Sequence, residues 1–195
     1  MTTDPYDVLG GYDDERPPAL GAVVESDRGT LPFALIHGEA LVACAAWALG
    51  EAGVTPVDVG TRWEGIVESG EPFVLHDPLC PMTPAGFIAE CVEAAVTREA
   101  VVVGVRPVTD TVKKVTDGEV GETVDRDRLR VVTSPIVLPA AVVAALDGLP
   151  ANDFARLAGE LARRFPVIPL EAPAEGRRVA DLDDVRLLEA LTLPR

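Results

Sequence analysis

Residues 105–113 read Val105-Arg106-Pro107-Val108-Thr109-Asp110-Thr111-Val112-Lys113, and they mark the point where the chain changes from core to surface. The β-branched run that leads into them, Val101 to Val105, is typical of a strand buried on both faces of a sheet. After Pro107, small polar and charged residues alternate around Asp117-Gly118, a pair that favours an exposed turn. We therefore expect a buried strand that runs into a projecting polar arm, over about residues 107–134.

The rest of the chain alternates short apolar runs with amphipathic segments. We expect strands at Leu20–Val24, Val54–Val59, Phe73–Leu75, Leu129–Val132 and Val167–Ile168. We expect helices at Gly38–Leu49, after Thr83-Pro84 as capping and first helical residues, at Pro139–Leu146, at Asn152–Phe165, and after the capping residue Asp181. This alternation predicts an α/β fold in which helices cover a sheet through right-handed crossovers.

Composition limits the classes of function. Hydrophobic residues make up 48% of the 195 residues, which is ample for one full core over residues 19–195. The net charge of -15 disfavours non-specific binding to nucleic acid or to an anionic membrane. No uncharged apolar run approaches 18 residues, so we expect no membrane span. Residues 1–18, rich in acids and prolines, are expected to form a disordered tail.

The cysteines place the protein in a reducing compartment. Cys44, Cys80 and Cys91 are odd in number and lack CxxC spacing, so neither a disulfide framework nor a zinc site is supported. A cytoplasmic location is therefore expected. His37 and His76 stand alone without a spaced partner, and both are interpreted as structural.

Three groups of residues are candidates for chemistry. Asp77 follows an expected strand, where ligands bind in open α/β sheets, and its carboxylate suits a ribose hydroxyl or a magnesium ion; the alternative is a turn aspartate before Pro78. Cationic and hydroxyl side chains on the arm suit phosphoryl oxygens, although their residue types alone favour a solvated charged hairpin: Thr111, Lys113, Arg126 and Arg128. The pair Arg177-Arg178 either contacts phosphate or lies in solvent.

Four motifs in the same order resemble those of the 2-C-methyl-D-erythritol 4-phosphate cytidylyltransferases of isoprenoid biosynthesis. They are His76-Asp77-Pro78-Leu79-Cys80-Pro81, Pro107 to Lys113, Thr123-Val124-Asp125-Arg126 to Leu129, and Ser134-Pro135. The resemblance covers Phe73 to Pro139 well and Asn152 to Leu188 loosely. Two of these motifs have the forms DTxK, at residues 110–113, and DRxxL, at residues 125–129. At this separation they are together fairly specific for the family.

The resemblance implies a three-layer, Rossmann-like nucleotidyltransferase domain and a homodimer that exchanges its arms. It implies a magnesium-dependent reaction in which a sugar-alcohol phosphate attacks the α-phosphorus of CTP. By this resemblance Asp77 is assigned to the ribose and the metal, and Ser26 to the nucleotide. Three residues of the arm are assigned to the acceptor substrate, namely Thr111, Lys113 and Arg126. Arg178 takes the place of a substrate-binding Lys and, with Arg28, is assigned to catalysis.

The nucleotide end departs from the family pattern. The Gly-rich loop is replaced by Val24 to Gly29, and Glu25 and Asp27 oppose CTP if they face the pocket. Phe33 stands where the family has a catalytic Lys, so Arg28 replaces one of two cations. Two functions therefore stay open: a divergent cytidylyltransferase, or an inactive paralogue that binds a phosphorylated metabolite or a partner protein.

Overall fold

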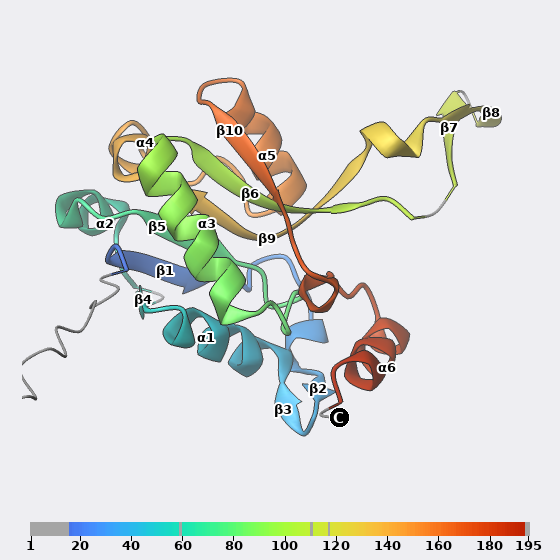
Figure 1. Cartoon of the computed structure of the whole chain (residues 1–195), viewed down its shortest axis with the longest axis horizontal. Helices are drawn as coiled ribbons and strands as arrows, with labels where there is room; N and C mark the ends of the chain where they lie inside the picture. The colour runs from blue at the N-terminus through green and yellow to red at the C-terminus, as the bar shows by residue number, and fades with distance from the viewer. Residues whose placement is uncertain (1–15, 59, 110, 117, 194–195) are drawn as a thin grey trace, which may run out of the picture.

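The computed structural model describes residues 16–58, 60–109, 111–116 and 118–193, and its centre is a six-stranded sheet (Figure 1). The strand order is β10 (Val167–Glu171), β6 (Val101–Pro107), β9 (Arg130–Leu138), β5 (Phe73–His76), β1 (Ala19–Val23) and β4 (Val54–Pro56). Neighbouring strands are parallel except at β9, which is antiparallel to both β5 and β6. The carboxyl ends of β1 and β5 therefore meet at one edge.

Helices cover both faces of this sheet, because side chains along each strand alternate between them. On one face, Phe73 and Leu75 of β5 belong to the same core cluster as buried residues of α2 (Trp63–Ser69), α4 (Ala140–Ala144) and α5 (Phe154–Ala162). On the other face, Val74 packs with residues of α1 (Leu41–Glu51) and α3 (Ala85–Arg98). The predicted three-layer α/β architecture is confirmed, including the double burial of Val101 to Val105.

Strand β9 is longer than expected and brings a polar residue into the centre of the sheet. Instead of ending at Val132, it runs from Arg130 to Leu138, because the residues after Val132 lie buried between β5 and β6. Its pairing with β6 shifts register next to Gly104. A Cβ at Gly104 would lie 2.6 Å from the carbonyl oxygen of Ser134, so only glycine fits there. This close approach holds Ser134 beside the end of β5.

Several element boundaries differ from the predictions. Thr83 does not cap α3: Pro84 is the N-cap, and the buried Thr83 hydroxyl donates to the carbonyl of Cys80 at 2.9 Å. The Asp181 cap is confirmed, since its side chain accepts from the backbone N–H groups of Asp183 and Asp184. Helix α2 and the short hairpin of β2 (Leu35–Ile36) and β3 (Glu39–Ala40) were not predicted, because each is too short for a periodic pattern.

The C-terminal segment is held against the sheet edge by a small core of its own. Buried residues of α6 (Leu182–Leu191) pack on β2, on the start of α1 and on the segment that follows β5; this cluster contains Ile36, Leu41, Leu79, Val179, Val185 and Leu188. The backbone N–H of Val179 also donates to the carbonyl of Leu79 at 2.8 Å. Residues 177–180 are therefore fixed next to residues 77–81.

The arm projects from the sheet, as Figure 1 shows. Strands β6 and β9 lead into a separate two-stranded hairpin of β7 (Val112–Thr116) and β8 (Glu119–Val124), followed by a single 3₁₀ turn at Arg126–Arg128. Val115 and Val120 pair across the hairpin and are 62% and 68% exposed. Residues 1–15 of the tail that was expected over residues 1–18, and Asp117 of the expected turn, lie outside the described residues. No described helix has the length and apolar character that crossing a membrane requires.

Candidate functional site

The candidate site is centred on Asp77, which directly follows β5 at the edge where β1 also ends. Asp77 is 1% exposed. Its Oδ1 accepts hydrogen bonds from Arg28 Nε and from the backbone N–H of Leu79, both at 3.0 Å, and its Oδ2 accepts from Arg178 Nε at 3.1 Å. A buried carboxylate is stable only when it is paired and hydrogen-bonded, and both oxygens of Asp77 meet this condition.

Arg28 is turned inward and ties three segments together. Besides Asp77, it donates from Nη1 to the carbonyl of Ser26 at 3.1 Å and from Nη2 to the carbonyl of Asn152 at 2.9 Å. Its guanidinium carbon lies 5.6 Å from the centre of the Phe154 ring, and its side chain is 4% exposed. All three of its nitrogens donate within the protein, and the assignment of Arg28 to catalysis stays a prediction.

Arg178 has the opposite geometry. Its Nε is held by Asp77, but its side chain is 35% exposed. Among the described residues, no acceptor is hydrogen-bonded to its two terminal nitrogens. Arg178 is therefore anchored at one end and presents planar N–H donors at the open edge, as recognition of a phosphate or carboxylate requires.

A buried polar pair lies beneath Asp77. The Ser134 hydroxyl accepts from the backbone N–H of Asp77 at 3.0 Å and is hydrogen-bonded to His76 Nδ1. A hydroxyl oxygen can accept from two donors, so the direction of the hydrogen bond between Ser134 and His76 depends on the imidazole tautomer; Nε2 of His76 has no hydrogen-bond partner among the described residues. Burial lowers the pKa of His76 to about 4, against a smaller opposing effect of the Asp77 charge. His76 is therefore neutral at pH 7 and serves, with Ser134, to hold the backbone of Asp77.

The loop at residues 25–29 is exposed except for Arg28. Glu25, Ser26 and Asp27 are exposed. Asp27 has a positive φ of 65°, and its Oδ2 accepts from the side-chain amide of Asn152 at 3.2 Å. The two acids thus lie on the solvent side of the loop, while Arg28 alone turns to Asp77. Phe33, in the place expected for a Lys, is 62% exposed.

The donor set around Asp77 does not fit a resident metal ion. Both carboxylate oxygens face guanidinium groups, and over residues 16–58, 60–109, 111–116 and 118–193 no three His, Cys, Asp or Glu side chains gather as a metal-binding group. The thiol of Cys80 lies near Asp77. Burial raises the pKa of this thiol well above its usual value, so the thiol is neutral and a poor metal ligand. In this structure Asp77 is the counter-ion of two arginines, and its assignment to a metal ion stays a prediction.

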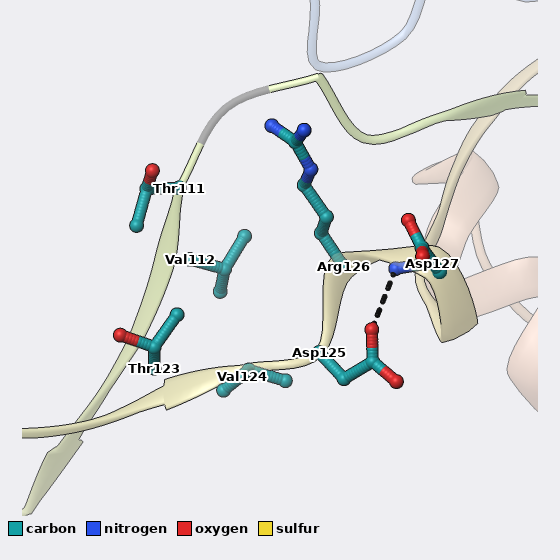
Figure 2. Close-up of a pocket in the computed structure, with 7 residues that line it drawn as sticks. All are labelled: Thr111, Val112, Thr123, Val124, Asp125, Arg126 and Asp127. Carbon is teal, nitrogen blue, oxygen red and sulfur yellow. Dashed lines mark hydrogen bonds between the residues drawn. The ribbon is translucent and has the colours of Figure 1, made fainter.

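The arm carries a second group of predicted residues. A hollow of about 310 Å³ is lined by Thr111, Val112, Thr123, Val124, Asp125, Arg126 and Asp127 (Figure 2). Arg126 is one of the lining residues, and its Nη1 donates to the carbonyl of Thr109 at 2.5 Å. Asp125 Oδ1 accepts a hydrogen bond from the backbone N–H of Asp127. Lys113 is exposed on β7, opposite Thr123.

The structure separates the two halves of the predicted site. Asp77, Arg28 and Arg178 meet at the sheet edge, whereas Thr111, Lys113 and Arg126 lie on the arm, which extends away from that edge in the same chain (Figure 1). The sequence did not predict that Ser134 or Asn152 would take part. The only signal for Arg28 was its position as the one cation among acids in residues 24–29.

Comparisons with known proteins point to one family. Residues 60–152 match the family profile described as "IspD: 2-C-methyl-D-erythritol 4-phosphate cytidylyltransferase". A protein of that name from Saccharopolyspora erythraea is 38% identical over 73 residues, which is 37% of this chain and 33% of the relative. One from Bacillus licheniformis is 30% identical over 135 residues, 65% of this chain and 57% of the relative. The chain spans about half the length of the curated relatives it matches.

Solved structures of the same kind share the fold. The crystal structure of 2-C-methyl-D-erythritol 4-phosphate cytidylyltransferase from Thermus thermophilus aligns with a TM-score of 0.65 at 24% identity, over 88% of this chain and 96% of that one. The 4-diphosphocytidyl-2C-methyl-D-erythritol synthase of Anaerococcus prevotii aligns with a TM-score of 0.62 at 14% identity, over 89% and 96% of the two chains. The Rossmann-like nucleotidyltransferase fold is confirmed.

Proposed function

We propose that this chain, which resembles the 2-C-methyl-D-erythritol 4-phosphate cytidylyltransferases, transfers the cytidylyl group of CTP to 2-C-methyl-D-erythritol 4-phosphate. In this reaction a phosphate oxygen of the acceptor attacks the α-phosphorus of CTP. A P–O bond forms there, the bond to the β-phosphate breaks, and pyrophosphate leaves with the electron pair. The proposed setting is the cytoplasm.

One observation carries the proposal: Arg178 is anchored through Nε by Asp77 at the edge where β1 and β5 end, and its side chain stays 35% exposed there. Ligands of open α/β sheets bind at this edge. Charge that develops on the transferring phosphoryl group is stabilised by donors fixed before the reaction begins, and an anchored guanidinium is such a donor. Arg178 is therefore the proposed catalytic residue, and Ser26, exposed in the neighbouring loop, the proposed nucleotide contact.

The acceptor end of the site is proposed to come from the arm of a second copy. Thr111, Lys113 and Arg126 carry the hydroxyl and cationic groups that suit a phosphate, but they lie away from Asp77 of their own chain. Arm exchange in a homodimer would bring them to the partner's Arg178. The exposed Val115 and Val120 offer the apolar surface for that exchange.

Enzymes of this family commonly use a divalent metal ion, and Mg²⁺ is the ion proposed here. It neutralises charge on the triphosphate. Because the donors around Asp77 do not fit a resident ion, Mg²⁺ is assigned to the nucleotide as part of the substrate. The protein groups then act by holding the phosphates in place, and Asp77 acts by orienting Arg178.

The test is pyrophosphate release from CTP, Mg²⁺ and 2-C-methyl-D-erythritol 4-phosphate. We expect release that depends on all three, that falls at least tenfold in Arg178→Met through loss of a charged donor, and that is unchanged in the adjacent Arg177→Met. No release above a blank at high enzyme concentration would overturn the proposal. In that case, binding of the acceptor phosphate without turnover would identify the protein as the inactive paralogue.

A further inference from the structure

The cluster of Arg28, Asp77 and Arg178 contains one more positive charge than negative charge. Asp77 and Arg28 are both nearly inaccessible, with side chains 1% and 4% exposed. Arg178 is the only member of the three with a substantial exposed fraction, 35%. The excess charge is therefore presented to ligands through Arg178 alone.

Arg28 supplies the excess positive charge that lets Arg178 attract an anion. Without Arg28, Asp77 and Arg178 would carry no net charge together, and the attraction on an approaching anion would be weaker. Arg28 Nε occupies Oδ1 at 3.0 Å, so the charge of Asp77 is shared between two cations. Arg28 itself points away from any ligand, since its other nitrogens donate to the carbonyls of Ser26 and Asn152. Its effect on a ligand is thus electrostatic and indirect.

We propose that Arg28, Asp77 and Arg178 form an arginine clamp that binds a phosphate-bearing anion through Arg178 without any metal ion on the protein, with Arg28 as a positioning residue that offsets the charge of Asp77. The choice of ligand rests on the proposed function, in which pyrophosphate is the leaving group. The binding itself requires neither CTP nor turnover.

This arrangement makes an unusual prediction about Asp77. If Asp77 held a divalent ion that bridges to phosphate, removing its charge would weaken binding in the presence of Mg²⁺. In the clamp, Asp77 is a negative charge in direct contact with Arg178, and Asp77→Asn removes that charge while it keeps one oxygen that can accept from an arginine. The substitution should therefore leave the affinity for an anion unchanged or increase it.

The experiment is calorimetric titration of the full-length protein with inorganic pyrophosphate, once with Mg²⁺ and once with EDTA. We expect dissociation constants within about threefold of each other, a loss of roughly tenfold or more in Arg178→Met, and a smaller loss in Arg28→Met. Arg28→Lys, which keeps the charge, should recover most of the affinity. Arg177→Met is the matched control and should bind as the wild type does.

Three outcomes would overturn the clamp. They are binding that EDTA abolishes, weaker binding in Asp77→Asn with Mg²⁺ present, and unchanged affinity in Arg28→Met. Circular dichroism spectra of each variant show whether it is folded, and Arg28→Lys and Asp77→Asn keep the test decisive if Arg28→Met does not fold. If pyrophosphate binds with the expected ranking of affinities among the variants but no turnover is seen, the clamp is supported and the proposed function is contradicted. If turnover is seen but pyrophosphate does not bind, the proposed function is supported and the clamp is contradicted.

Discussion

Arg28 Nε lies 3.0 Å from Asp77 Oδ1, across 49 residues of sequence, and neither side chain is more than 4% exposed. This ion pair joins the loop after β1 to the end of β5. Removing one partner of a buried pair leaves the other charge uncompensated, so the pair should matter for folding as well as for the site.

Arg28→Ala should lower the free energy of unfolding by up to about 3–5 kcal/mol, the cost of an uncompensated buried charge, reduced by the pairing of Asp77 with Arg178 that remains. Chemical denaturation measures this change. The matched control is Arg186→Ala, which removes an exposed i,i+3 pair with Asp183 and should cost no more than about 0.5 kcal/mol. Equal effects in the two variants would contradict the buried-pair account.

Acid should destabilise the protein through His76. The pKa of His76 is about 4 when folded and has its ordinary value near 6.5 when unfolded, so the unfolded state takes up the proton first. Its contribution to stability is complete above pH 6.5, decreases as the pH falls toward 4, and amounts to roughly 3 kcal/mol. Denaturation of the wild type and of His76→Gln between pH 4 and pH 7 measures it. The variant should lose less stability than the wild type over that range, and parallel curves would exclude His76 as the cause.

The three cysteines should differ in reactivity. All are free, and burial raises the pKa of each thiol, but Cys44 is only partly buried while Cys80 and Cys91 are buried. Because the thiolate is the reactive form, a thiol reagent at pH 8 should modify Cys44 first and the other two only at the rate of unfolding. Mass spectrometry of peptides after timed labelling identifies the order. Early labelling of Cys80 would contradict the closed packing beneath Asp77.

Gly104 should not tolerate a side chain. A Cβ there would lie 2.6 Å from the carbonyl oxygen of Ser134, so Gly104→Ala must push β9 away from β6 and should cost about 1–3 kcal/mol. Gly159 is the control, since a Cβ at this helical position meets no atom within 4 Å. Gly159→Ala should stabilise α5 by up to about 1 kcal/mol. Opposite signs in thermal melting are the expected result.

A large part of the fold could be predicted from local patterns. The β-branched run at Val101 to Val105 is read correctly as a doubly buried strand, and the amphipathic spacing of residues 152–165 as a helix, because burial imposes its period directly on the sequence. The Asp181 cap follows from local hydrogen-bond chemistry. The short helix α2 and the extension of β9 to Leu138 leave no such pattern, since their burial depends on neighbours distant in the chain.

By itself, the sequence determined the α/β class, the projecting arm and the family motifs around Asp77, since each depends on residues close together in the chain. Only the tertiary structure decided what those residues contact. It turned Arg28 inward to Asp77 and Asn152, left Arg178 at the open edge, and placed the acids Glu25 and Asp27 on the solvent side. The reason is physical: a buried charge must find its partner in space, and Arg28 and Asp77, which are 49 positions apart, give no local sign of that pairing.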